Sequence, residues 1–245
     1  MLLYYIRHAD PIYSPDSLTP LGTRQAEALA HRLAAHGIDR IYSSSSQRAQ
    51  DTARPTAEIV KKDVTVLDWA HEETFWEEAS VKQPEGGTRW FMHTIKYRNL
   101  MNSDEIRDLG KNWFDHPEFK DTTLPGGIKR IQREADAFLL SLGYEHDRAK
   151  NCYIPVRPND DRVAFFAHQS FGIAFLSAIL DIPYPMFCTH FDINHSGMTV
   201  VEFGDKGFDY NIRNDVVIPQ MITLSNDSHL WREGLPTRQV NGTFI

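Results

Sequence analysis

Short apolar runs alternate with longer segments of helical periodicity along most of this chain, and this alternation limits the fold more than any other feature. The clearest apolar runs cover residues 2–6, 163–167 and 198–203. A helical segment follows the first run and opens with Thr19-Pro20, a typical helix start. Strands that alternate with helices form a mainly parallel sheet with helices on both faces. We therefore expect an α/β fold of the three-layer αβα sandwich type.

Residues 71–124 interrupt this alternation. They contain no run typical of a strand, and they are rich in aromatic side chains: Phe75, Trp76, Trp90, Phe91, Tyr97, Trp113, Phe114 and Phe119. Large apolar side chains serve burial more often than ligand binding. We expect residues 71–124 to form a mostly helical insert, or cap, with a small core of its own. The whole chain, residues 1–245, is expected to be a single domain around this insert.

Charge and cysteine content exclude several classes of protein. Lysine and arginine number 26 and aspartate and glutamate number 33, which gives a formal net charge of −7. Proteins that bind nucleic acid normally present a basic face, so we expect no nucleic-acid partner. An anionic substrate must instead be attracted by a local group of cations. The two cysteines, Cys152 and Cys188, are too few for a disulfide framework or a four-cysteine zinc site.

The apolar runs are too short for membrane insertion, because a spanning helix needs about 20 apolar residues. Residues 2–6 are followed at once by Arg7-His8. A secretory signal needs a basic start and roughly 7–15 apolar residues, which this segment lacks. We therefore expect no membrane partner and a cytoplasmic location.

Cationic and imidazole side chains follow two of the predicted strands. Arg7-His8 ends the first strand, and His168 follows the strand at 163–167. Because ligands bind at the carboxyl ends of parallel strands, we expect both histidines and Arg7 to meet at one edge of the sheet. Arg48 follows the serines at 43–46 into the first turn of another predicted helix, where N–H groups and the helix dipole favour an anion. The sequence therefore predicts an anion site.

Together these motifs resemble the histidine phosphatase superfamily, which has the phosphoglycerate-mutase-like fold. The resemblance rests on Arg7-His8 after the first strand, on residues 18–22 (LTPLG) at the start of the first helix, on residues 43–53 and on the strand before His168. It leaves the insert and the C-terminal tail unmatched. The resemblance implies the fold that the alternation also predicts.

The resemblance also implies a role for each of these side chains. His8 would be the nucleophile that becomes a phosphohistidine, and His168 would be the second catalytic histidine, in contact with the phosphoryl oxygens. Arg7 and Arg48 would bind the same oxygens, which suits planar guanidinium groups. Gln169 stands where the family commonly has glycine, and it would either point its amide at the phosphate or serve as a larger residue at the helix start. No cofactor is implied.

Proton transfer needs further groups. His8 must attack as the neutral imidazole, so its other ring nitrogen is expected to donate a hydrogen bond to a backbone carbonyl. The family also implies a carboxylic acid after the third strand, which protonates the leaving oxygen and later activates water. Glu72 is the preferred candidate, and Glu73, Asp68 and Glu77 are alternatives. We expect partial burial to raise the pKa of the Glu72 carboxyl toward the working pH.

The remaining histidines and the tail are expected to lie outside the chemistry. His190 and His195 lack an obvious carboxylate at metal-ligand spacing, so no metal site is predicted. Residues 195–197 are expected to border the active site, as the corresponding loop of the family does. Residues 225–245 are polar and rich in turn formers, so we expect a surface loop or a contact in a possible homodimer.

The sequence thus predicts a phosphomonoesterase that hydrolyses a small phosphorylated metabolite through a phosphohistidine on His8. Phosphoglycerate-mutase-type phosphoryl transfer is an alternative in the same fold. The longer basic motifs of family mutases are not apparent in the sequence, which favours hydrolysis. A non-catalytic protein that binds a phosphorylated ligand is a second alternative, and a metallohydrolase, which a chelator would identify, is a third.

Overall fold

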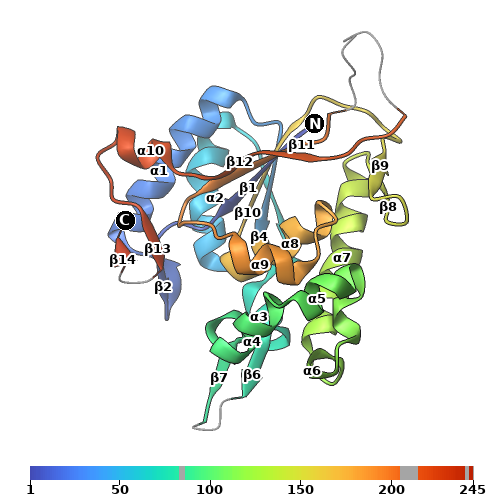
Figure 1. Ribbon diagram of the computed structural model, residues 1–245. Helices are drawn as coiled ribbons and strands as arrows, with labels where there is room; N and C mark the ends of the chain where they lie inside the picture. Colours follow the sequence, from blue (N-terminus) through green and yellow to red (C-terminus); the bar gives the residue numbers. More distant parts are fainter. Residues whose placement is uncertain (83–85, 205–214, 241–242, 245) are drawn as a thin grey trace.

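The computed structural model describes residues 1–82, 86–204, 215–240 and 243–244, and six of the described strands form its central sheet (Figure 1). The strand order is β12-β11-β1-β10-β4-β5. Four neighbouring strands are parallel, and β11 and β12 pair antiparallel at one side. Their bounds are β1 Leu2–Arg7, β4 Arg40–Ser44, β5 Val64–Leu67, β10 Arg162–Ala167, β11 Met198–Glu202 and β12 Gln220–Asn226. The predicted mainly parallel sheet is confirmed.

Side chains alternate across this sheet and bury both of its faces. Tyr4 and Ile6 pack with α1 (Pro20–His36) and α2 (Gln47–Val60) on one face. Leu3 and Tyr5, one residue out of step, pack into the larger cluster on the opposite face, which is covered by α7 (Leu124–Ser141), α8 (Gln169–Ile179) and α9 (Tyr184–His190). This period of two is that of a strand buried on both faces. The three-layer αβα sandwich is therefore confirmed.

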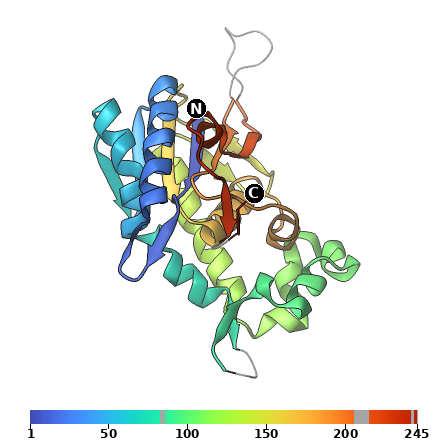
Figure 2. The same cartoon turned by 90° about the vertical axis from the view of Figure 1, so that its left-hand side faces the viewer.

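The insert projects from one end of the sheet and is mostly helical (Figures 1 and 2). The expectation that it holds no strand is wrong, because β6 and β7 form an antiparallel hairpin within it. Strands of three residues are too short to show a periodicity in the sequence. The insert elements are α3 Glu72–Glu78, β6 Ser80–Lys82, β7 Thr88–Trp90, η2 Phe91–His93, α4 Ile95–Met101, α5 Asp104–Leu109, η3 Gly110–Asp115 and α6 Pro117–Lys120.

The expectation of a separate small core in the insert is also wrong. Phe75, Trp113 and Phe119 of the insert belong to the same cluster of buried side chains as Phe165 and Phe171 of the sheet layer. Helix α3 packs against α7 and α8, so the aromatic rings of the insert extend the main core instead of forming a second one. The insert therefore packs against the end of the sheet through the main core.

Several elements lie where loops were expected. Strand β9 (Cys152–Ile154) pairs with β8 (Glu145–Asp147). The tail contains the end of β12, helix α10 (Ser228–Arg232) and strand β13 (Arg238–Val240), which pairs with β14 (Thr243–Phe244). Residues 241, 242 and 245 of the tail lie outside the described residues. The remaining short elements are β2 Pro11–Tyr13, β3 Asp16–Leu18 and η1 Asp68–Ala70. No helix in the described part of the chain is long and apolar enough to cross a bilayer.

Candidate active site

His8 follows β1 and is almost fully buried, with 1% of its surface exposed. Its Nδ1–H donates to the carbonyl oxygen of Ala9 at 2.8 Å, so the predicted hydrogen bond to a backbone carbonyl is confirmed. This bond fixes the tautomer and leaves the lone pair on Nε2. Burial, with the nearby charges of His168, Arg7 and Arg48, holds the pKa of His8 well below its usual value. The ring is therefore neutral at pH 7, as a nucleophile must be.

His168 follows β10, and its ring lies beside that of His8 with centroids 5.3 Å apart. The Nε2 of His168 is 2.8 Å from the Ser44 Oγ and 2.9 Å from the Ser46 Oγ. Its Nδ1 lies 3.3 Å from the Glu72 Oε2. The serines come from the segment that leads β4 into α2, so that segment orients His168. The run of serines is visible in the sequence, but no local pattern indicates its contact with a histidine more than 120 positions away.

Arg7 is buried and connects the two histidine strands to the loop before β11. Its Nη1 donates to the carbonyl oxygen of Ile193 at 2.7 Å, and its Nη2 donates to the His195 Nε2 at 2.6 Å. Burial, with the charge of Arg7, lowers the pKa of His195 to about 2, which keeps the ring a neutral acceptor. Ser196 N–H donates to the carbonyl oxygen of His8 at 3.1 Å. The prediction that residues 195–197 border the site is confirmed.

Arg48 reaches the same place from the first turn of α2. Its Nη1 donates to the Asp16 Oδ1 at 2.8 Å. Its Nη2 lies 3.3 Å from the His168 Nδ1 and 3.5 Å from the Glu72 Oε2. The guanidinium also lies over the ring of Tyr13, 5.3 Å from its centroid. The structure thus brings Arg7, Arg48 and both histidines to one edge of the sheet.

Glu72 is the first residue of α3, and its carboxylate faces this group. Its Oε1 accepts hydrogen bonds from Ser170 N–H at 3.0 Å and from Ser170 Oγ at 2.5 Å. Burial alone raises the pKa of Glu72, but the interaction with His168 and the hydrogen bond from the Ser170 hydroxyl outweigh it and hold this pKa well below its usual value. The expectation of a raised pKa is wrong, because partners that stabilise the charged form prevail over burial.

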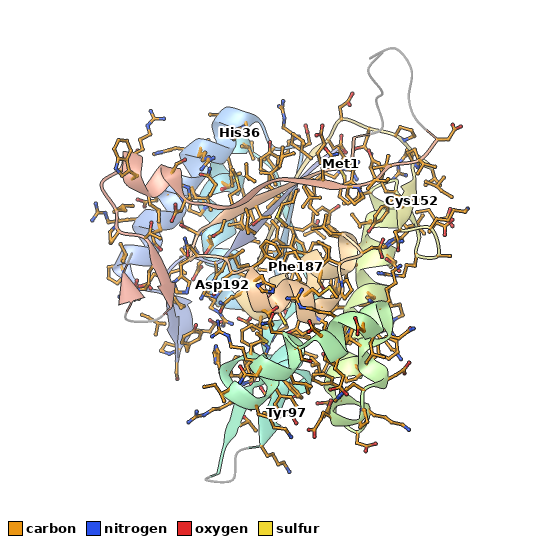
Figure 3. All side chains as sticks on the ribbon, viewed as in Figure 1. Met1, His36, Tyr97, Cys152, Phe187 and Asp192 are labelled. Atoms are coloured by element: carbon orange, nitrogen blue, oxygen red, sulfur yellow. The ribbon has the colours of Figure 1, made fainter. Side chains whose placement is uncertain are left out.

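The other candidate acids and Gln169 are placed differently. Glu73, Asp68 and Glu77 are exposed, whereas Glu72 is partly buried. Gln169 is half-buried, and its amide N–H donates to the Asp192 carboxylate. Asp192, labelled in Figure 3, lies above the insert that carries Tyr97. The amide of Gln169 is thus directed to a carboxylate in this structure.

A cavity of about 660 Å³ opens in front of this group and is shared by the sheet and the insert. The sheet side contributes Arg7, Arg48, Gln169 and Ser170, and the insert side contributes Glu72, Glu73, Trp76 and His93. Cavities of this size hold small organic ligands. The two guanidinium groups supply the local positive charge that an anionic ligand needs in a protein of net negative charge.

The same group of side chains has metal-ligand chemistry. Ligand atoms of His8, Glu72 and His168 lie within 4.8 Å of one another, a cluster that the described residues place in the centre of the site. Two neutral imidazoles and a carboxylate are donors that zinc accepts. The guanidinium groups of Arg7 and Arg48 lie beside them, and their charge repels a dication and attracts an anion. The electrostatics therefore favour a phosphoryl group over a metal ion.

Comparison with known proteins adds an independent line of evidence. The family model of the histidine phosphatase superfamily (branch 1) matches residues 3–99. A protein from Hydrogenobacter thermophilus, provisionally described as phosphoserine phosphatase 2, is 26% identical over 153 residues, which is 59% of this chain and 68% of that protein.

Solved structures share the fold over most of the chain. A phosphoserine phosphatase mutant from Entamoeba histolytica, in complex with phosphoserine, superposes with a TM-score of 0.58 at 19% identity, covering 94% of this chain and 98% of that one. The α-ribazole phosphatase from Shigella flexneri superposes with a TM-score of 0.55 at 18% identity, covering 93% of this chain and 97% of that one. A mycobacterial glucosyl-3-phosphoglycerate phosphatase superposes with a TM-score of 0.54 at 16% identity, covering 91% of this chain and 98% of that one. These similarities extend well beyond residues 3–99, which the family model matches.

Proposed function

Because residues 3–99 match the histidine phosphatase superfamily, we propose that this chain hydrolyses monophosphate esters of small metabolites through a phosphohistidine on His8. One observation carries the proposal: a buried neutral histidine is tied at Nδ1 to a backbone carbonyl, which leaves the lone pair on Nε2, and the charges of Arg7 and Arg48 lie close enough to lower its pKa. Tying one ring nitrogen sets the direction of the other, which is what an in-line attack on phosphorus requires.

Binding of the phosphoryl group falls to Arg7, Arg48 and His168. Phosphoryl transfer is catalysed mainly by positioning and by stabilisation of charge on the phosphoryl oxygens. Guanidinium groups provide paired N–H donors for such oxygens, and charge-assisted hydrogen bonds are stronger than neutral ones. The Arg48 guanidinium holds its position through Asp16, so it is preorganised for the oxygens. His8 then forms the nitrogen–phosphorus bond as the ester oxygen departs.

Glu72 is the proposed acid and base, but its low pKa changes how it acts. The carboxylate is ionised in the free protein, so the proton for the leaving oxygen must arrive with the substrate. A phosphate monoester has a second pKa of about 6, so the monoanion, about a tenth of the ester at pH 7, is the form that brings this proton. A bound phosphate also raises the pKa of a neighbouring carboxyl. Glu72 passes the proton to the leaving oxygen, and its carboxylate then activates the water that attacks phosphohistidine.

The class of substrate follows from the pocket and from the relatives. A cavity of about 660 Å³ holds more than a phosphate group, so the leaving group also contacts the protein. The similar proteins are described as phosphoserine phosphatases, a glucosyl-3-phosphoglycerate phosphatase and an α-ribazole phosphatase, whose names point to phosphorylated small molecules as substrates. Their leaving groups differ widely, so they support the substrate class without selecting one compound.

A panel of phosphate monoesters tests the function directly. We expect release of inorganic phosphate from at least one of phosphoserine, 3-phosphoglycerate, sugar phosphates and an α-ribazole phosphate, with no loss of activity in EDTA. His8→Ala is expected to reduce turnover at least 1000-fold, because it removes the nucleophile. Transfer of the phosphoryl group to a second hydroxyl without phosphate release would indicate a mutase. Tight binding without turnover would indicate a binding protein, and loss of activity in EDTA would indicate a metallohydrolase.

A further inference from the structure

Ser170 makes two hydrogen bonds to a single oxygen of Glu72. It is the second residue of α8 and is 2% exposed. Its backbone N–H lies 3.0 Å from the Glu72 Oε1, and its Oγ lies 2.5 Å from the same atom. An ionised carboxylate only accepts hydrogen bonds, so Ser170 is the donor in both. The bonds join residues 98 positions apart in the chain and connect α8 to α3.

The two carboxylate oxygens of Glu72 therefore have different partners. Oε1 is held by Ser170 at the N-terminal end of α8, where the helix dipole also stabilises negative charge. Oε2 faces the His168 Nδ1 at 3.3 Å and the Arg48 Nη2 at 3.5 Å. Holding one oxygen turns the other toward the phosphoryl site and keeps a short glutamate side chain in one orientation.

We propose that Ser170 is a positioning residue that fixes Glu72 through Oε1, so that Oε2 alone exchanges the proton with the leaving oxygen and with water. This inference rests on the proposed function. Ser170 borders the cavity but takes no part in making or breaking bonds in this proposal, and it acts through its hydrogen bonds to Glu72. Its hydroxyl also favours the charged carboxylate, which agrees with the low pKa of Glu72.

A second buried serine on the same helix provides a matched control. Ser177 is 3% exposed, and its Oγ donates to the carbonyl oxygen of Ala174 at 2.9 Å within α8. Ser170→Ala and Ser177→Ala each remove one buried hydroxyl from one helix. Ser170→Ala keeps the backbone N–H bond to Glu72, so it tests the hydroxyl alone. Ser170→Thr restores a hydroxyl at the position.

The charge of Glu72 can be measured without turnover. In protein labelled with carbon-13 at glutamate Cδ, the Glu72 resonance is assigned by its loss in Glu72→Gln. We expect Ser170→Ala to raise the pKa of Glu72 by about one unit, because a hydrogen bond to the charged form is lost. Ser177→Ala and Ser170→Thr are expected to titrate as the wild type does. An unchanged Glu72 titration in Ser170→Ala would overturn the proposal.

Kinetics test the positioning. Rapid-quench measurements give the rate of phosphoenzyme formation from phenyl phosphate and from 4-nitrophenyl phosphate. Phenolate is the more basic leaving group, so the reaction of phenyl phosphate depends more strongly on protonation of the leaving oxygen. We expect Ser170→Ala to slow phosphoenzyme formation from phenyl phosphate about tenfold, with a KM within about twofold of the wild-type value. We expect it to change the rate with 4-nitrophenyl phosphate less than about threefold. Ser170→Thr is expected to restore at least half of the wild-type rate. A serine with a structural role only would affect both substrates equally, as Ser177→Ala should.

Failure of this inference differs from failure of the proposed function. A wild type that turns over without a phosphoenzyme would overturn the proposed function and Ser170's role with it. A wild type with a phosphoenzyme, combined with a Ser170→Ala variant that behaves like Ser177→Ala, would overturn the role of Ser170 alone.

Discussion

Three imidazoles share one small space in this protein, and their charge depends on where the arginines lie. The ring of His8 is 5.3 Å from that of His168 and 5.4 Å from that of His195. Burial lowers the pKa of all three, and the charge of Arg7 lowers those of His8 and His195 further. Fixed positive charge in the site therefore comes from Arg7 and Arg48, while His8 and His195 remain neutral and His168 interacts with the Glu72 carboxylate. A single site can therefore attract an anion through its arginines and still hold the neutral imidazole that the proposed mechanism needs.

Removing Arg48 is expected to weaken anion binding more than it affects folding. Arg48→Gln removes a guanidinium that lies beside His168 and Glu72, and a hydrogen bond to a charged group contributes about 1.5–3 kcal/mol. We expect the inhibition constant of vanadate to rise at least tenfold, which is about 1.4 kcal/mol. Arg54→Gln is the control, because Arg54 lies exposed on the same helix and pairs with Asp51. Equal inhibition constants in the two variants would contradict a phosphate role for Arg48.

At the scale of residues, the sequence was enough to predict which side chains meet in the proposed site, but not the protonation state of Glu72. His8, Arg7 and His168 follow strands, so the edge at which they meet could be predicted from the strand order alone. The low pKa of Glu72 depends on Ser170, which is 98 positions away, and on the orientation of two side chains. No local pattern encodes such a contact. Burial was the only influence on the Glu72 pKa that the sequence could suggest, and burial raises this pKa instead of lowering it.

At the scale of elements, the junction of β1 and α1 holds the catalytic loop. The Thr19 Oγ1 accepts from Gly22 N–H at 3.0 Å as the cap of α1, and it donates to the Asp10 Oδ2 at 2.7 Å. A β-carbon on Gly22 would lie 2.2 Å from the carbonyl oxygen of Asp10. The first turn of α1 therefore packs directly on the backbone two residues after His8, which only glycine permits.

Gly22→Ala is expected to lower both stability and activity. The added methyl group must displace Asp10, so we expect a loss of about 1–3 kcal/mol in the free energy of unfolding and at least a tenfold loss in kcat. Gly126→Ala is the control, because a β-carbon at Gly126, in α7, meets nothing within 4 Å. There alanine should stabilise slightly through its higher helix propensity. Thermal unfolding and steady-state kinetics measure both; a Gly22→Ala enzyme of wild-type kcat would show that the loop tolerates displacement.

Elements could be predicted where they are long or buried on both faces. Strands β1 and β10 are continuous apolar runs, and α1 has a proline start and a glycine end, so all three were expected. Strand β12 was missed because it lies at the sheet edge and its seven residues include polar ones. The hairpin of β6 and β7 was missed because each strand has three residues. Length and burial, more than composition, decide which elements a sequence reveals.

On the scale of the whole molecule, parts far apart in the chain complete the site. The tail, expected as a surface loop, places the Arg238 Nη1 2.6 Å from the Asp10 Oδ1. The carbonyl oxygen of Arg238 accepts from His195 N–H at 3.0 Å. The insert supplies Glu72, Trp76 and the opposite wall of the pocket. In the proposed function, the sheet and its loops bind the phosphoryl group, and the junction with the insert contacts the leaving group.

The covalent intermediate tests the central claim most directly. In a rapid-quench experiment with a hydrolysed substrate, we expect about one acid-labile, alkali-stable phosphoryl group per active chain, located on His8 by peptide mass spectrometry. His8→Ala should show none, and His31→Ala, at an exposed position of α1, should label as the wild type does. Phosphate release at the wild-type rate without a phosphoenzyme, or with the phosphoryl group on a residue other than His8, would contradict the account.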